Sequence, residues 1–249
     1  MLAQVPQDPA SRAQASLAHA PQGSSPPRVP PSKAQVPEGT PRSPARITYP
    51  AAGHEKFAVA SGETAAPAGK KGELLHYQVA VERDIHGVTA DEFARTVTAT
   101  LRDPRSWTAG GEWRLQRVGP GDRADFVVRL VTPKTRDALC AGARDGYTSC
   151  RSGDKVVVNV ARWVKGVPGY GAGLDAYRQY VINHEVGHRL HQAHELCPGK
   201  GDPAPVMQQQ TLGLHGCTAN AWPFLNGDRY RGRIGAYDDN VPPRDKGNP

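Results

Sequence analysis

Residues 183–194 read NHEVGHRLHQAH and place four of the chain's nine histidines around one glutamate. The surrounding sequence predicts a helix from about Leu174 to Leu190, in which residues four apart lie one above the other. His184 and His188 would therefore present two ring nitrogens to one metal ion. Glu185 would lie beside them, where it can take a proton from water that the metal polarises. The alternative is an amphipathic helix whose histidines are ordinary surface or core groups.

A third ligand has two candidates, His191 and His194. On an unbroken helix His191 would lie about 10.5 Å along the axis from His184. Both imidazoles could then hardly reach one zinc ion, because Zn–N bonds are about 2.0–2.1 Å long. We therefore expect the helix to end after His188, His191 to adopt a left-handed or irregular backbone, and the chain to turn back. This predicts a Zn²⁺ site of His184, His188 and His194.

The segment HEVGHRLHQAH (184–194) resembles the metzincin signature H-E-x-x-H-x-x-G-x-x-H, with His191 where that family has glycine. The resemblance implies zinc ligation by His184, His188 and His194, a catalytic glutamate at Glu185, and a methionine in a tight turn below the metal. The stretch PAPVMQQQT (203–211) supplies Met207 for that turn. Taken alone, Met207 is better interpreted as an ordinary core methionine.

A closer resemblance is to an uncharacterised group of actinobacterial secreted or membrane-anchored proteins with a zincin-like domain. It is carried by NHEVGH, the later histidine, CPG, APVMQQQT and the upstream VVVNVARW, and covers roughly residues 70–225. It implies a zincin-like α/β (α+β) fold with a mixed twisted sheet, an active-site helix and a small loop-rich C-terminal subdomain with a Met-turn.

Periodicity along the chain is consistent with that fold class. A capping box from Thr89 to Glu92 opens a helix over 89–101. Alternating and β-branched residues predict strands, and the order of elements indicates a mixed sheet. These strands are expected at 57–63, 73–83, 112–118, 124–133 and 155–164.

The strand KVVVNVARW has two interpretations. It is either a buried core strand or, as the resemblance to metzincins implies, the edge strand that holds an extended peptide by backbone pairing. We favour the second, with Val157, Val158 and Asn159 as substrate-binding residues.

The four cysteines form two sequential pairs flanked by turn residues, which predicts disulfides Cys140–Cys150 and Cys197–Cys217 and an oxidising compartment. A cysteine zinc site is the alternative, but the C-x-x-C spacing is missing. We expect a secreted protein or one on the outer face of the cell envelope. Neither an export signal nor a transmembrane stretch is visible, so a membrane association would need an anchor outside this sequence.

Composition divides the chain in two. Residues 1–47 are rich in Pro, Ala, Ser and Gln and are predicted to be a disordered linker, whereas 48–249 can form one domain, with about the last ten residues flexible. The net charge of +7 is spread without a basic stripe, so we expect no nucleic-acid partner.

The sequence thus predicts a secreted zinc-dependent peptidase acting on a peptide or protein substrate, with cell-wall-associated substrates among the candidates. Two alternatives stay open. One is a hydrolase of peptidoglycan or other envelope amides, and the other is a non-catalytic binding domain stabilised by zinc.

Overall fold

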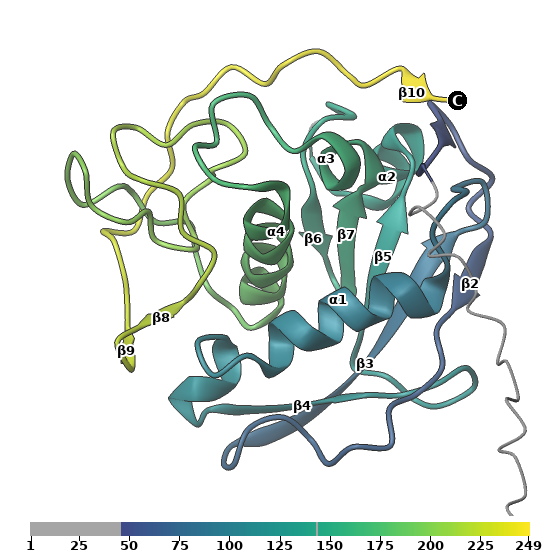
Figure 1. The fold of residues 1–249 in the computed structure, drawn as a ribbon, viewed down its shortest axis with the longest axis horizontal. Helices are drawn as coiled ribbons and strands as arrows, with labels where there is room; N and C mark the ends of the chain where they lie inside the picture. Colours follow the sequence, from purple (N-terminus) through teal and green to yellow (C-terminus); the bar gives the residue numbers. More distant parts are fainter. Residues whose placement is uncertain (1–45, 143) are drawn as a thin grey trace, which may run out of the picture. The chain divides into compact units, whose positions relative to one another are not determined.

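The computed structural model describes residues 46–142 and 144–249, which lie in the compact unit Ser43–Pro249. The predicted linker over residues 1–47 falls almost entirely outside the described residues. Within the compact unit, strands alternate with helices in the first two thirds of the chain, and loops dominate the last third (Figure 1).

The main sheet is mixed, as the sequence predicts. Its strands run in the order β2-β3-β5-β7-β6, and β4 also pairs with β3. The pairs β3–β4, β3–β5 and β5–β7 are parallel, whereas β2 and β6 run antiparallel to their neighbours. The bounds are Phe57–Val59 (β2), Glu73–Glu82 (β3), Trp113–Arg117 (β4), Phe126–Val131 (β5), Cys150–Ser152 (β6) and Lys155–Asn159 (β7).

Two long helices cover one face of this sheet (Figure 1). Helix α1 is Ala90–Arg102, and it opens with the predicted capping box between Thr89 and Glu92. Helix α4 is Leu174–Arg189. The main core lies between these helices and the sheet, because the strands direct alternate apolar side chains toward them.

Strand β7 shows how this alternation divides the core. Val156 and Val158 belong to the main cluster under the helices, whereas Val157 joins a smaller cluster on the other face with Val131 and Cys140. All three valines of β7 are fully buried. The sheet is therefore covered on both faces where β7 runs.

The segment expected to be a strand over 155–164 is a strand followed by a helix. Helix α3 (Val160–Lys165) begins directly after β7, because the Asn159 side chain accepts a hydrogen bond from the Ala161 N–H and caps it. Likewise β5 ends at Val131, and helix α2 (Pro133–Leu139) begins with proline in its first turn. A 3-10 turn, η1 (Trp107–Gly110), precedes β4.

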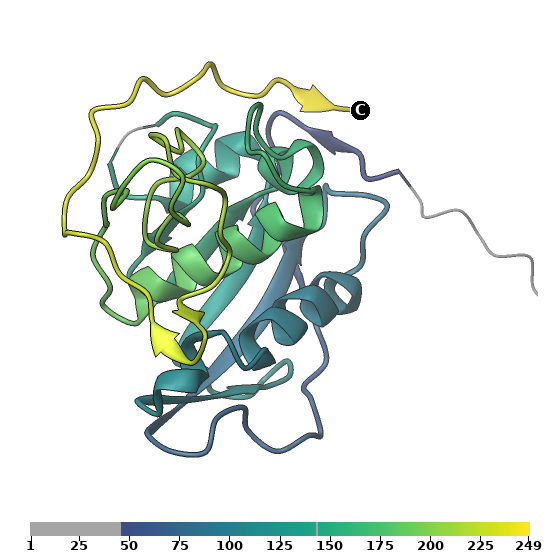
Figure 2. The same ribbon diagram turned by 60° about the vertical axis from the view of Figure 1, so that its left-hand side comes forward.

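After α4 the chain forms loops that lie along one side of that helix, in yellow-green in Figure 2. Their regular elements are the short pair β8 (Phe224–Leu225) and β9 (Asp228–Arg229). The end of the chain contains β10 (Gly247–Asn248), which pairs with β1 (Tyr49–Pro50). Among the described residues no helix is both long and apolar enough to cross a membrane.

Candidate metal centre

Helix α4 carries the first two histidines on one face. His184 and His188 are one turn apart, and their ring centroids are 4.8 Å apart. Each ring is oriented by a backbone carbonyl: His184 Nδ1 lies 2.9 Å from Val206 O, and His188 Nδ1 lies 2.9 Å from Gln192 O. A carbonyl oxygen can only accept, so each Nδ1 carries the proton and each Nε2 keeps a lone pair.

The helix ends where the sequence analysis expects it to end. His191 has φ 64°, in the left-handed region. The Gln192 N–H donates to Gly187 O at 2.9 Å, and the His191 N–H donates to His188 O at 3.2 Å. These two bonds form a Schellman motif, with His191 at the position that usually holds glycine. The chain therefore reverses directly after α4.

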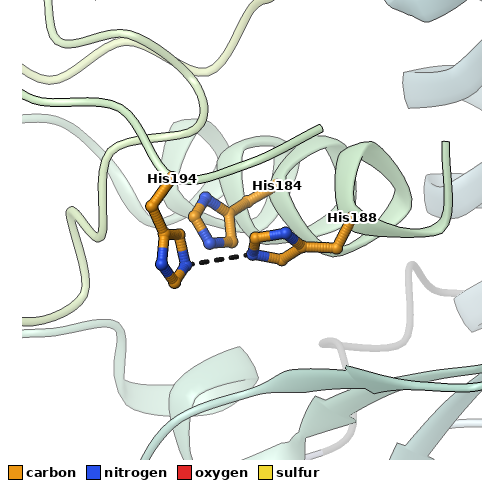
Figure 3. A group of neighbouring side chains, drawn as sticks. All are labelled: His184, His188 and His194. Carbon is orange, nitrogen blue, oxygen red and sulfur yellow. Dashed lines mark hydrogen bonds between the residues drawn. The ribbon is translucent and has the colours of Figure 1, made fainter. Parts of the chain in front are cut away.

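This reversal brings His194 back to the helix, so that all three imidazoles point toward one another (Figure 3). His194 Nε2 lies 3.0 Å from His188 Nε2. One ligand nitrogen from each of the three histidines lies within 4.8 Å of the other two. Two nitrogens held at about 2.0–2.1 Å by one tetrahedral ion would be about 3.3 Å apart. The three imidazoles are therefore close enough together to hold one metal ion.

The electrostatics favour the neutral imidazoles that a metal requires. Burial lowers the pKa of His184 well below its usual value, and the neighbouring His188 and His194 lower it further. Burial also lowers the pKa of His188. The pKa of His194 falls to about 4, through burial and the proximity of His188. All three rings are therefore neutral at pH 7.

Met207 lies in a tight turn against the same helix. The turn is closed by the Gln208 N–H, which donates to Pro205 O at 2.9 Å. Val206, inside this turn, supplies the carbonyl that orients His184. The Met207 side chain is fully buried, and a Cβ added to Gly187 would lie 2.5 Å from its sulfur. The turn thus supports the helix directly beside the histidines.

Glu185 faces a cavity of about 460 Å³ that the three histidines also line. It is 6% exposed, and its Oε2 has no hydrogen-bond partner within the described parts of the chain. Burial raises the pKa of Glu185 to about 8, while the positive charges of Arg136 and Arg151 oppose that rise. An unpartnered buried carboxylate at a cavity wall is able to exchange a proton with a molecule bound there.

Strand β7 is not the edge strand, so the prediction for Val157, Val158 and Asn159 is wrong. It pairs with β5 on one side and β6 on the other, and all three residues are fully buried. Asn159 uses its side chain to cap α3 and to bind the carbonyls of residues 146 and 147. The edge is the short β6, whose Cys150 and Arg151 line the cavity.

Both predicted disulfides are present. Cys140 and Cys150 are 6.1 Å apart at Cα, and Cys197 and Cys217 are 5.9 Å apart. The second bond links the chain just after His194 to the chain just beyond the Met207 turn. A cysteine metal site is thereby ruled out, because all four cysteines are oxidised in pairs.

Two buried residues beside the site, Asn183 and Glu195, were not predicted from the sequence. Asn183 is fully buried, accepts a hydrogen bond from Ser106 and donates to Ala221 O, which ties α4 to two distant loops. Glu195 is 5% exposed and pairs with Arg229 at 3.1 Å. Each is adjacent in the sequence to a predicted ligand, His184 or His194, and this adjacency is the only feature of the sequence that points to them.

Residues 43–222 match the family described as "Protein of unknown function (DUF3152)", and the chain belongs to that family. No curated protein and no solved structure matches the chain.

Proposed function

We propose that this protein is a secreted, zinc-dependent peptidase with a metzincin-like, and thus zincin-like, domain. The observation that carries the proposal is the convergence of three neutral imidazoles, from His184, His188 and His194, on the cavity that Glu185 also faces. Structural zinc sites usually have four protein ligands, whereas catalytic sites have three and keep one position open. A three-histidine set beside an unpartnered carboxylate therefore favours catalysis over a purely structural metal.

The chain's own residues have separable roles in this mechanism. His184, His188 and His194 would hold the ion, and the carbonyls of Val206 and Gln192 fix the orientation of the first two rings. The bound zinc would supply Lewis acidity, lowering the pKa of water and stabilising negative charge on a peptide carbonyl oxygen. Glu185 would accept a proton from water during attack and deliver it to the leaving amine.

The surroundings of Glu185 suit this task. Its Oε2 faces the cavity without a hydrogen-bond partner among the described residues, which leaves it able to accept a proton from a molecule bound there. The disulfides support an extracellular setting, because such bonds persist in oxidising compartments.

The decisive experiment compares wild type with Glu185→Ala, both purified with disulfides intact and supplied with zinc. We expect about one zinc per chain in each by metal analysis, since Glu185 stands outside the ligand set. Hydrolysis of a peptide library, followed by mass spectrometry, should fall by about 10²–10⁴-fold in the variant. A matched control is Glu73→Ala, which removes an exposed carboxylate at the start of β3.

Two results would contradict the proposal. If zinc-loaded wild type cleaved no peptide, including isolated peptidoglycan stem peptides, the non-catalytic binding domain would become the better account. If Glu185→Ala lost its zinc stoichiometrically, Glu185 would be a ligand and its assignment as proton acceptor would fail.

A further inference from the structure

The charged side chains in the wall of the cavity are not all paired with one another. Besides Glu185, the wall contains the acidic Asp145 and the basic Arg136 and Arg151. Arg136 ion-pairs with Asp137 at 3.1 Å and with Asp145 at 3.0 Å. Asp145 is further engaged by the N–H groups of residues 147 and 148 and by the Thr148 hydroxyl. Arg136 and Asp145 thus neutralise each other within the wall.

Arg151 differs from Arg136 in both position and partners. It lies on the edge strand β6, and it is exposed. Its Nε donates to His188 O at 3.2 Å, at the end of α4. In residues 46–142 and 144–249 no carboxylate lies within ion-pair distance of its guanidinium. The single backbone bond holds the side chain against the helix and directs no terminal nitrogen to an acidic partner.

This arrangement leaves a guanidinium fork at the wall of the proposed active site. The planar fork matches a carboxylate with two parallel N–H···O bonds, and a side chain already held at Nε loses less freedom on binding. The charge of Arg151 is close enough to act on both Glu185 and His188. A carboxylate bound to Arg151 would therefore lie in the same cavity as the reacting peptide bond.

We propose that Arg151 is a specificity-determining residue that binds a carboxylate of the peptide substrate, which makes acidic peptides the preferred substrate class. A role of Arg151 in selecting substrates rests on the proposed peptidase function. The ability of Arg151 to bind a carboxylate does not depend on that function. Two sources supply the same chemistry: an aspartate or glutamate side chain near the scissile bond, or the free C-terminal carboxylate of a short peptide.

The test uses the zinc-loaded chain and pairs of fluorescent quenched peptides that differ by Glu against Gln at one position, scanned across the sequence. A second set compares a free C-terminal acid with its amide. The variants are Arg151→Gln and Arg151→Glu. The matched control is Arg83→Gln, because Arg83 is also exposed and its Nε also donates to a carbonyl, Phe57 O at 3.3 Å, away from the cavity.

We expect wild type and Arg83→Gln to favour the acidic member of a pair by about 10–100-fold in kcat/KM, the range of a charge-assisted hydrogen bond. Arg151→Gln should abolish that preference, and Arg151→Glu should reverse it, favouring Gln over Glu at the same position. A preference confined to the Glu/Gln pairs identifies a side-chain carboxylate. One confined to the acid/amide pairs identifies a chain terminus.

Binding of the same peptides to zinc-loaded Glu185→Ala, measured by fluorescence anisotropy, separates this proposal from the proposed function. Glu185→Ala should bind the acidic member of each pair more tightly than the neutral member, and adding Arg151→Gln should remove that difference. This result would support the carboxylate site even if wild type hydrolyses no peptide. If wild type cleaves the peptides but no assay shows an acidic preference that depends on Arg151, the inference is overturned while the peptidase function stands.

Discussion

Two regions of the molecule are held together in different ways. The sheet-and-helix half (residues 46–142 and 144–190) has a continuous apolar core and strand pairing. The loop-rich half (residues 191–249) adds few residues to that core, Met207 and Trp222 among them, and is also held by buried amides. Gln208 Nε2 donates to the carbonyls of residues 213 and 214, and Gln210 Nε2 donates to those of residues 205 and 220.

The candidate metal site is built from both halves. His184, His188 and Glu185 belong to a helix packed into the core, whereas His194 and the carbonyl of Val206 come from the loop-rich half. Buried side-chain amides stabilise loops only while their partners stay in place, since an unsatisfied amide costs about 1–3 kcal/mol. A bound metal would therefore stabilise the loop-rich half more than the sheet-and-helix half.

The largest expected effect comes from removing the ligand that the loop-rich half supplies. His194→Ala should weaken zinc binding by more than about 100-fold, since loss of even the outer partners of metal ligands costs about 10–100-fold. Competition titration with a chelator measures this affinity. His191→Gly is the control, because His191 lies three residues earlier, is outside the ligand group, and holds a left-handed backbone that glycine also adopts. If His194→Ala kept the wild-type affinity for zinc, His194 would not be a ligand, and the metal would not connect the two halves.

The second prediction concerns the disulfide of the loop-rich half. Replacing Cys197 and Cys217 by serine opens a loop of 20 residues and should lower the free energy of unfolding by about 3 kcal/mol. Native-state hydrogen exchange should show the largest loss of protection between residues 195 and 218, with β5 and β7 little changed. An equal loss in both halves would mean that they unfold as one unit, and the comparison would fail.

The third prediction addresses the contact between the halves at Gly187. A Cβ there would lie 2.5 Å from Met207 Sδ and 2.6 Å from Trp107 Cζ2. Gly187→Ala should therefore introduce about 1–3 kcal/mol of strain, which outweighs the gain of about 1 kcal/mol in helix propensity. Denaturant unfolding measures the net loss. Gly187→Ala should lower the free energy of unfolding by less in a Met207→Ala background. An equal loss in both backgrounds would show that the clash is not with Met207.

The smallest effect is expected at His191. Glycine adopts φ near 64° without the penalty that a side chain incurs, so His191→Gly should stabilise the fold by up to about 1 kcal/mol and leave zinc content unchanged. Thermal unfolding with metal analysis tests both statements. Loss of zinc in this variant would mean that the His191 side chain binds the metal, and the assignment of His191 to the turn alone would be wrong.

Sequence reasoning succeeded where one local rule governs the structure. The 3.6-residue period predicts α4, the capping box predicts the start of α1, and the helical rise predicts the reversal at His191. The mixed sheet follows from alternating strands with β-branched residues. Each of these features is encoded within a few neighbouring residues.

The errors occurred where distant partners decide the structure. Apolar residues over 155–164 suit a strand as well as a buried helix, and only the Asn159 cap separates β7 from α3. Edge position depends on whether another strand pairs alongside, and β6 is too short to be recognised from three residues. Contacts of Asn183 and Glu195 reach across 34 or more residues, so no periodicity records them.

The pairing of β1 with β10 has a practical consequence. Tyr49 lies opposite Asn248, and Lys165 and Tyr49 both contact Asp245. The first and last segments of the folded unit are therefore paired neighbours. A circular permutant that joins Pro249 to Ile47 through a short glycine linker, with new ends opened in the exposed turn at Gly153, would keep this geometry.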